Sequence, residues 1–156
     1  MKKTKFSLAH KDDEIFDLIK KTDQKILAVW AIDCAKRVLP YFEKKFPKDK
    51  RPRLALKTLQ TWLKTGVFKM AVIRKASLDA HAAAREVGEY SPARSAARAC
   101  GQAVATAHVP RHAYGSAVYA QQAIFRASKP TVTDAKVAKE RDWQYQDLLD
   151  LRKNFK

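Results

Sequence analysis

The chain has 156 residues, of which 46% are hydrophobic and 31% charged, and its formal net charge is +16. This length predicts a single domain that buries about two-thirds of its unfolded surface and needs no disulfide or metal to hold it together. No stretch reaches the roughly 18 uninterrupted apolar residues of a membrane span, so we expect no bilayer crossing.

The N-terminal residues and the two cysteines indicate where in the cell the protein is found. Residues 1–10 are expected to form a flexible basic arm, because charged residues at 11–14 interrupt the start before an apolar signal-peptide stretch can develop. Cys34 and Cys100 lie among apolar neighbours in helical patterns, where cysteines behave as small buried hydrophobes. We therefore expect a cytoplasmic protein with both thiols reduced.

Helix signals follow one another along the first half of the chain. A first helix is predicted over residues 12–21, and a second from residue 23 past residue 39, where Pro40 should kink or end it. Residues 26–32 are apolar on nearly every side, which is typical of a helix surrounded by others. A third helix should open with Pro52 and stop before Gly66, and a fourth should span about residues 68–87.

The second half continues the pattern. Ser91 and Pro92 form a start signal for a fifth helix that reaches about residue 106. Pro110 should impose a kink, after which a sixth helix runs to about residue 127. The last helix is predicted over residues 134–153, with Thr133 as its cap. Because nothing predicts a strand, we expect an all-α, single compact domain of about six or seven helices.

Alanine dominates the middle of the chain. Seventeen alanines lie between Ala76 and Ala127, accompanied by Gly101 and Gly115. Ala97, Gly101 and Ala105 form a stripe of small residues at helical spacing. Small side chains let helix backbones approach closely, so we expect the fourth, fifth and sixth helices to pack tightly in a soluble bundle.

Positive charge is concentrated in one quarter of the chain. Between residues 36 and 75 there are thirteen lysines and arginines against two acidic residues. The densest part is a predicted turn, which we call the basic turn: Lys44, Lys45, Lys48, Lys50, Arg51, Arg53 and Lys57. Such a field attracts an acidic partner, either a protein or a nucleic acid. The alternative is a solvated face that only keeps the protein soluble.

Several polar side chains fall on apolar helix faces. Asp33 lies in the buried-type second helix, and Arg37 at i+4 is its nearest partner in sequence. Because an isolated buried charge is very costly, further partners should come from neighbouring helices. The polar core expected from this pattern contains Trp30, Asp33, Arg37, His81, Arg85, Arg98, Gln102, His108 and His112. An ion-pair network that fixes helix register explains it without catalysis.

Three histidines raise the question of a metal. His108 and His112 are four residues apart, and His81 could supply a third nitrogen from another helix, with Asp33 as ligand or support. No HExxH motif or carboxylate-rich di-metal pattern accompanies them, so the favoured interpretation is histidines satisfied by Gln102, Thr106 or carbonyl groups, with no cofactor. Ser95 and Ser116 lack a GxSxG context, and no glycine-rich phosphate loop is present.

Three segments in fixed order carry a family resemblance. They are the stretch from Trp30 to Pro40, the stretch from Ala80 to Arg85, and the stretch from Gly101 to Pro110. Together they resemble the helical domain of bacterial immunity proteins of the immunity-five-like group, over about residues 27–125. The resemblance implies a small intracellular all-α protein that binds and neutralises a toxin. It implies no catalytic residue.

The leading hypothesis is a noncatalytic cytoplasmic protein that binds a toxin. Because the chain is strongly basic, the toxin should be acidic, or the contact should avoid the basic turn. The alternatives are a metal-dependent helical-bundle enzyme that uses His81, His108 and His112, and a nucleic-acid-binding protein that uses the basic turn.

Overall fold

The computed structural model describes residue 6 and residues 13–155. This part of the chain contains seven helices and no strand, which confirms the all-α prediction. The helices are α1 (Asp13–Lys20), α2 (Gln24–Glu43), α3 (Arg51–Thr65), α4 (Met70–Arg85), α5 (Pro92–Ala105), α6 (His112–Ala127) and α7 (Thr133–Asn154).

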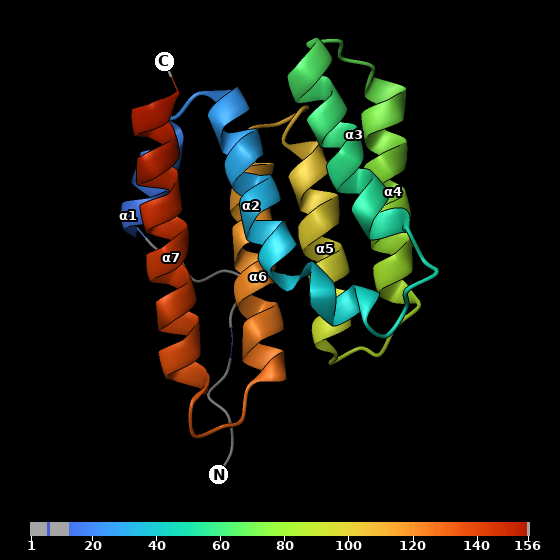
Figure 1. Cartoon of the computed structure of the whole chain (residues 1–156), viewed down its shortest axis with the longest axis vertical. Helices are drawn as coiled ribbons and strands as arrows, with labels where there is room; N and C mark the ends of the chain where they lie inside the picture. The colour runs from blue at the N-terminus through green and yellow to red at the C-terminus, as the bar shows by residue number, and fades with distance from the viewer. Residues whose placement is uncertain (1–5, 7–12, 156) are drawn as a thin grey trace.

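The bundle is built around α2, α5 and α6. Figure 1 shows these helices in the middle, with α1 and α7 on one flank and α3 and α4 on the other. Residues 26–32 do form the centre, since Ala28, Trp30 and Ala31 are fully buried. Most buried positions of α5 and α6 are alanine, glycine or serine, which lets their backbones approach closely, as the alanine count predicts.

Local signals set most helix ends. The Asp23 carboxylate caps α2 by accepting a hydrogen bond from the Lys25 amide, and the Ser91 hydroxyl does the same for the Arg94 amide in α5. Gly66 ends α3 in the left-handed region at φ 71°, a conformation that costs little only for glycine. These three helix ends lie where the sequence predicts them.

Pro40 does not end its helix, and the predicted cap of the last helix is displaced by one residue. Pro40 lies inside α2, which continues to Glu43 and thereby buries Phe42 completely, a gain that outweighs one missing backbone hydrogen bond. Thr133 is not the cap of α7. Val132 holds that position, while the buried Thr133 hydroxyl donates to the Lys129 carbonyl at 2.8 Å.

Pro110 separates two helices rather than bending one. Residues 106–111 form a succession of turns between α5 and α6, and the Gln24 side chain donates to the Thr106 carbonyl at 2.9 Å to satisfy the end of α5. The arm expected at residues 1–10 lies outside the described residues except for Phe6, whose ring centroid is 5.4 Å from that of Phe125.

Two further expectations concern the buried thiols and the membrane. Cys34 and Cys100 are free and buried, as predicted for reduced cysteines. Within the described residues, none of the helices combines the length and the apolar character needed to cross a bilayer.

Candidate functional site

The three histidines of the predicted polar core surround one pocket. His81 comes from α4, His108 from the turn after α5, and His112 from the first turn of α6, and a cavity of about 180 Å³ lies between them. We call this the histidine pocket. Its other lining residues are Met70, Ile73, Arg74, Ser77, Leu78, Gln102 and Ala105.

His81 is held by its neighbours in one neutral tautomer. Its Nδ1 lies 2.8 Å from Nη1 of Arg98, and a guanidinium can only donate, so Nδ1 must accept and the ring proton must be on Nε2. Burial, followed by the charges of Arg98 and Arg85, lowers the pKa of His81 to about 4. The ring is therefore neutral at physiological pH.

The opposite edge of the His81 ring rests on the backbone of α5. A Cβ atom added to Gly101 would lie 2.7 Å from His81 Nε2, which is shorter than a van der Waals contact and therefore a clash. The Ser77 hydroxyl also donates to the Gly101 carbonyl at 2.9 Å, so α4 and α5 are joined at this point. The sequence predicts that Gly101 allows close helix packing. The structure shows that it also leaves room for the His81 imidazole.

His112 and His108 have different surroundings. Nδ1 of His112 lies 2.8 Å from Oε1 of Gln102, and burial lowers the pKa of His112. His108 is exposed and stacks on Phe68, with ring centroids 6.3 Å apart. It follows the end of α5, where the chain turns outward, so it lines the mouth of the pocket instead of the interior.

The geometry gives no metal centre. Among residue 6 and residues 13–155, no group of three or more His, Cys, Asp or Glu side chains is arranged to hold a metal ion. The Nδ1 atoms of both His81 and His112 are already engaged by protein partners. The hypothesis of a three-histidine enzyme therefore gains no support from the arrangement.

Asp33 and Arg37 lie in a second polar cluster, between α2 and α7. The sequence predicts a pair between Arg37 and Asp33. In the structure Arg37 instead forms a bidentate ion pair with Glu140, whose side chain is only 2% exposed. Its guanidinium also lies 3.8 Å from the ring centroid of Trp143. A buried carboxylate needs a counter-charge more than the half-exposed Asp33 does, which explains the choice of partner.

Asp33 lies close to the half-buried Asp147, whose buried Oδ2 receives no hydrogen bond from a donor of the described residues. Burial, and then the hydrogen bond and charge of Asp33, raise the pKa of Asp147 to about 7. Two carboxyl groups can share a hydrogen bond only when one holds a proton, so this pair is protonated once below neutral pH.

The predicted polar core is thus divided into two clusters. His81, Arg98, Gln102 and His112 lie together and are half-buried, whereas Arg37, Arg85 and His108 are exposed rather than enclosed. Trp30 is buried, and its Nε1 donates to the Gln144 carbonyl at 2.8 Å. The polar residues that sequence reasoning missed are on the inner face of α7: Glu140, Gln144 and Asp147.

Asp147→Asn should raise stability at high pH only. The folded pKa of Asp147, about 7, exceeds the unfolded value of roughly 3.9, so the native state takes up a proton and loses stability as pH rises between these values. Because Asp147 is partly solvated, we expect a gain of about 1 kcal/mol at pH 8 and almost none near pH 4. Urea unfolding across this range measures it, with the exposed Asp142→Asn as control. Equal gains at both pH values would contradict the shared proton.

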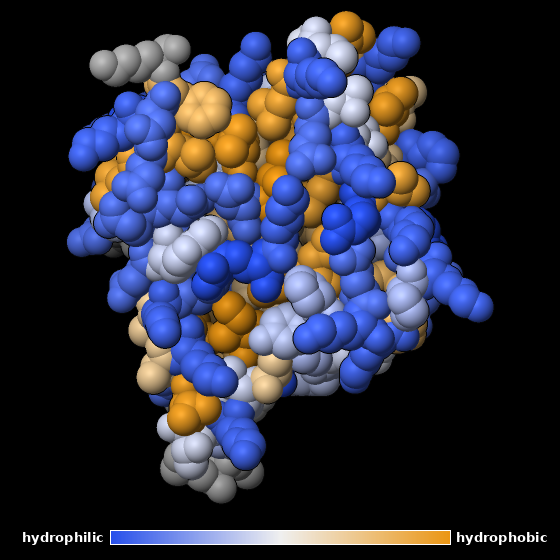
Figure 2. Space-filling view, viewed as in Figure 1, coloured by the Kyte–Doolittle hydropathy of each residue, from blue (hydrophilic) through white to orange (hydrophobic). Residues whose placement is uncertain are grey.

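The basic turn connects α2 to α3, and its two arginines form ion pairs with carboxylates of the same chain. Arg51 pairs with Asp49 at 2.7 Å and with Glu86 in the α4–α5 connection, and Arg53 pairs with Glu43 at 2.6 Å. The lysines are all exposed: Lys44, Lys45, Lys48, Lys50 and Lys57. Figure 2 shows one face of the molecule, where hydrophilic side chains cover most of the surface and apolar ones are visible between them.

Comparison with known families places the chain. The family described as "Imm-5 like putative immunity protein" matches residues 17–151, from within α1 nearly to the end of α7. The chain belongs to this family. No curated protein and no solved structure matches it. The match extends beyond residues 27–125, where the three resembling segments lie, and includes the whole of the α2–α7 polar cluster.

Proposed function

We propose that this protein neutralises a toxin by binding it, in the cytoplasm and without catalysis. The observation that carries the proposal is membership of the Imm-5 like family over residues 17–151. An immunity protein of this kind needs a stable scaffold and a surface complementary to its partner, and it needs no reactive group.

The state of the reactive side chains supports a binding role. His81 and His112 have partners within the bundle at 2.8 Å each. Both cysteines are buried, and burial raises the pKa values of Cys34 and Cys100, so neither is a thiolate at neutral pH. These two histidines and both cysteines are therefore engaged or unreactive.

The charge distribution supports an acidic partner. Five exposed lysines of the basic turn carry charge that is not matched by the internal pairs of Arg51 and Arg53. Opposite potentials accelerate encounter between proteins, and this effect weakens as salt screens it. We assign the basic turn the role of steering the toxin toward the protein.

Stoichiometry tests the proposal directly. The probe is a toxin selected by co-expression rescue: genes adjacent to this one are expressed singly, and one whose product arrests growth unless this protein is present is then assayed in vitro with purified protein. A binder should abolish toxin activity only near one equivalent, and the two proteins should co-elute as a complex. Neutralisation by a small fraction of an equivalent would show that the protein modifies the toxin and would overturn the noncatalytic proposal.

Charge reversal in the basic turn should slow association. We expect the combined substitutions Lys44→Glu, Lys45→Glu and Lys48→Glu to reduce the association rate about tenfold at low salt and to leave the dissociation rate nearly unchanged. Stopped-flow or surface-based kinetics with the same toxin measures both rates. The matched control reverses three exposed lysines elsewhere, Lys129, Lys136 and Lys139, and should have a smaller effect. Equal slowing by both sets would assign the effect to net charge alone.

A further inference from the structure

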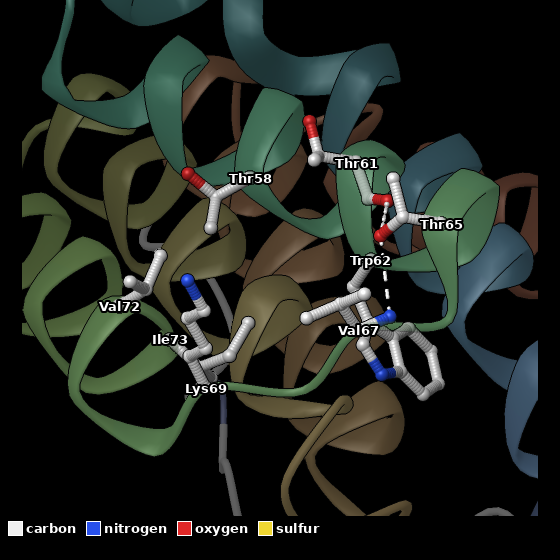
Figure 3. A pocket seen from close by; sticks show the side chains of 8 residues that line it. All are labelled: Thr58, Thr61, Trp62, Thr65, Val67, Lys69, Val72 and Ile73. Carbon is white, nitrogen blue, oxygen red and sulfur yellow. Dashed lines mark hydrogen bonds between the residues drawn. The ribbon is translucent and has the colours of Figure 1, made fainter.

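An open groove runs between α3 and α4, next to the histidine pocket, with which it shares Ile73. Figure 3 shows the side chains that line it, which come from both helices and from the connection between them. We call it the α3–α4 groove: Thr58, Thr61, Trp62, Thr65, Val67, Lys69, Val72 and Ile73. Its volume is about 470 Å³, within the range of sites that receive a ligand or a side-chain cluster.

Three threonines of the α3 wall have hydroxyls that are engaged within the helix. Their hydroxyls donate to carbonyls one turn back in the same helix: Thr58 to Leu54 at 2.8 Å, Thr61 to Lys57 at 3.0 Å, and Thr65 to Thr61 at 2.8 Å. Each hydroxyl thus donates to the helix backbone, and the Thr65 hydroxyl also accepts a hydrogen bond from the Val67 amide at 3.2 Å. This wall therefore offers no free hydroxyl donor to a ligand.

The floor and the other wall are apolar. Trp62 and Ile73 form the buried floor, whereas Val67 is 59% exposed and Val72 51% exposed. Further large apolar side chains are exposed close by in sequence, at Phe68 and Met70. Apolar side chains gathered in this way mark an interaction surface more often than scattered ones do.

The stretch of chain that supplies the groove carries charge of one sign. No acidic residue occurs between Asp49 and Asp79, while this stretch holds Lys50, Arg51, Arg53, Lys57, Lys64, Lys69, Arg74 and Lys75. Lys69 lines the groove, and Lys57 and Lys64 are exposed residues next in sequence to its threonines Thr58 and Thr65. A partner segment must therefore bring apolar anchors for the floor and carboxylates for the rim.

We propose that the α3–α4 groove receives an acidic amphipathic helix of a protein partner. Two neighbouring helices leave a groove into which a third can pack, with anchors at i, i+4 and i+7. From Thr58 to Thr65 the α3 wall spans about 10 Å, enough for two helical turns. A second copy of this chain would bring the same positive charge to the rim and be repelled. A nucleic acid would leave the apolar floor uncovered.

This inference rests on the proposed function, because it assigns the toxin the chemistry of that helix. A defined probe tests the groove without the toxin: a labelled peptide of about 14 residues, with leucine at i, i+4 and i+7 and glutamate on the other faces. Fluorescence anisotropy should show binding that weakens with salt. Amide chemical shifts should change within residues 58–73 and at the Trp62 indole.

Matched variants decide the outcome. Val72→Asp and Val67→Asp, at exposed positions that do not support the core, should weaken peptide binding at least about fivefold. Val132→Asp, exposed in the α6–α7 connection, should not. Thr61→Val removes a hydroxyl but keeps the shape, so binding should be retained. Equal weakening by Val72→Asp and Val132→Asp, or competition by single-stranded DNA at the same amides, would overturn the proposal.

The toxin assay separates this proposal from the previous one. If Val72→Asp neutralises the toxin as well as the wild type does, the groove assignment fails while toxin binding stands. If the peptide occupies the groove as described but no equivalent of protein neutralises the toxin, the proposed function fails and the groove remains a site for another acidic partner.

Discussion

Arg37→Ala should destabilise the protein by about 2–3 kcal/mol, the largest loss that we expect from a single charged side chain. The Arg37 guanidinium reaches both Glu140 oxygens at 2.9–3.0 Å, and the Glu140 side chain is almost fully buried. Removal of the guanidinium leaves a carboxylate without its counter-charge and removes the contact with Trp143. The free energy of unfolding from urea denaturation measures the loss.

A second variant separates the charge effect from lost packing. Arg37→Ala combined with Glu140→Gln should recover most of the stability, because a neutral amide costs less to bury than an unpaired carboxylate. The control is Lys75→Ala, which breaks the exposed pair between Lys75 and Asp79 and should change stability by less than about 0.5 kcal/mol. If the double variant is as unstable as Arg37→Ala alone, the lost stability comes mainly from the packing of Arg37 on Trp143.

The sequence predicts helix positions well because the signals are local. Ser91, Asp23 and Gly66 act within one turn of themselves, so their effect can be derived without knowledge of the fold. Pro40 is the instructive exception. The cost of a proline in a helix is also local, but the burial of Phe42 that outweighs it depends on neighbouring helices.

The α7 face shows why one polar cluster was missed. The helical spacing of the last helix predicts a stripe of Val137, Arg141, Tyr145, Leu148 and Arg152. Val137 and Leu148 of this stripe are buried, but Glu140 and Gln144 complete the buried face between them. Its polar members are spaced at i+3 and i+4, a signal present in the sequence but masked by the preference for apolar residues. The partner of Arg37 could not be predicted from sequence, because Arg37 pairs with a residue of another helix and not with Asp33, four residues before it.

The α3–α4 groove had no sequence signal of its own. Threonine is read as a polar residue on an exposed helix face, and its hydroxyl could have pointed to solvent. Only the structure shows that these hydroxyls donate to the helix backbone and are not free for a ligand. The acid-free stretch between Asp49 and Asp79 was readable, but its relation to an apolar groove was not.

Gly101→Ala should cost about 2 kcal/mol, although alanine is the better helix former. The new methyl group would lie 2.7 Å from Nε2 and 2.9 Å from Cδ2 of His81, and the ring cannot move away freely because Arg98 holds its Nδ1 at 2.8 Å. Overpacking of about 3 kcal/mol then exceeds the gain of about 1 kcal/mol in helix propensity. Thermal and urea unfolding measure the difference.

His81→Ala decides whether the imidazole is the cause. In the His81→Ala background the Gly101→Ala methyl group enters the space that the ring occupied, so the second substitution should be neutral or stabilising, with a coupling energy of about 2 kcal/mol. Gly88→Ala is the matched control, because its nearest new contact is an ordinary 3.7 Å to Ser91. If Gly101→Ala costs the same with and without His81, backbone contact between α4 and α5 is what requires the glycine, and the histidine pocket is not the reason for it.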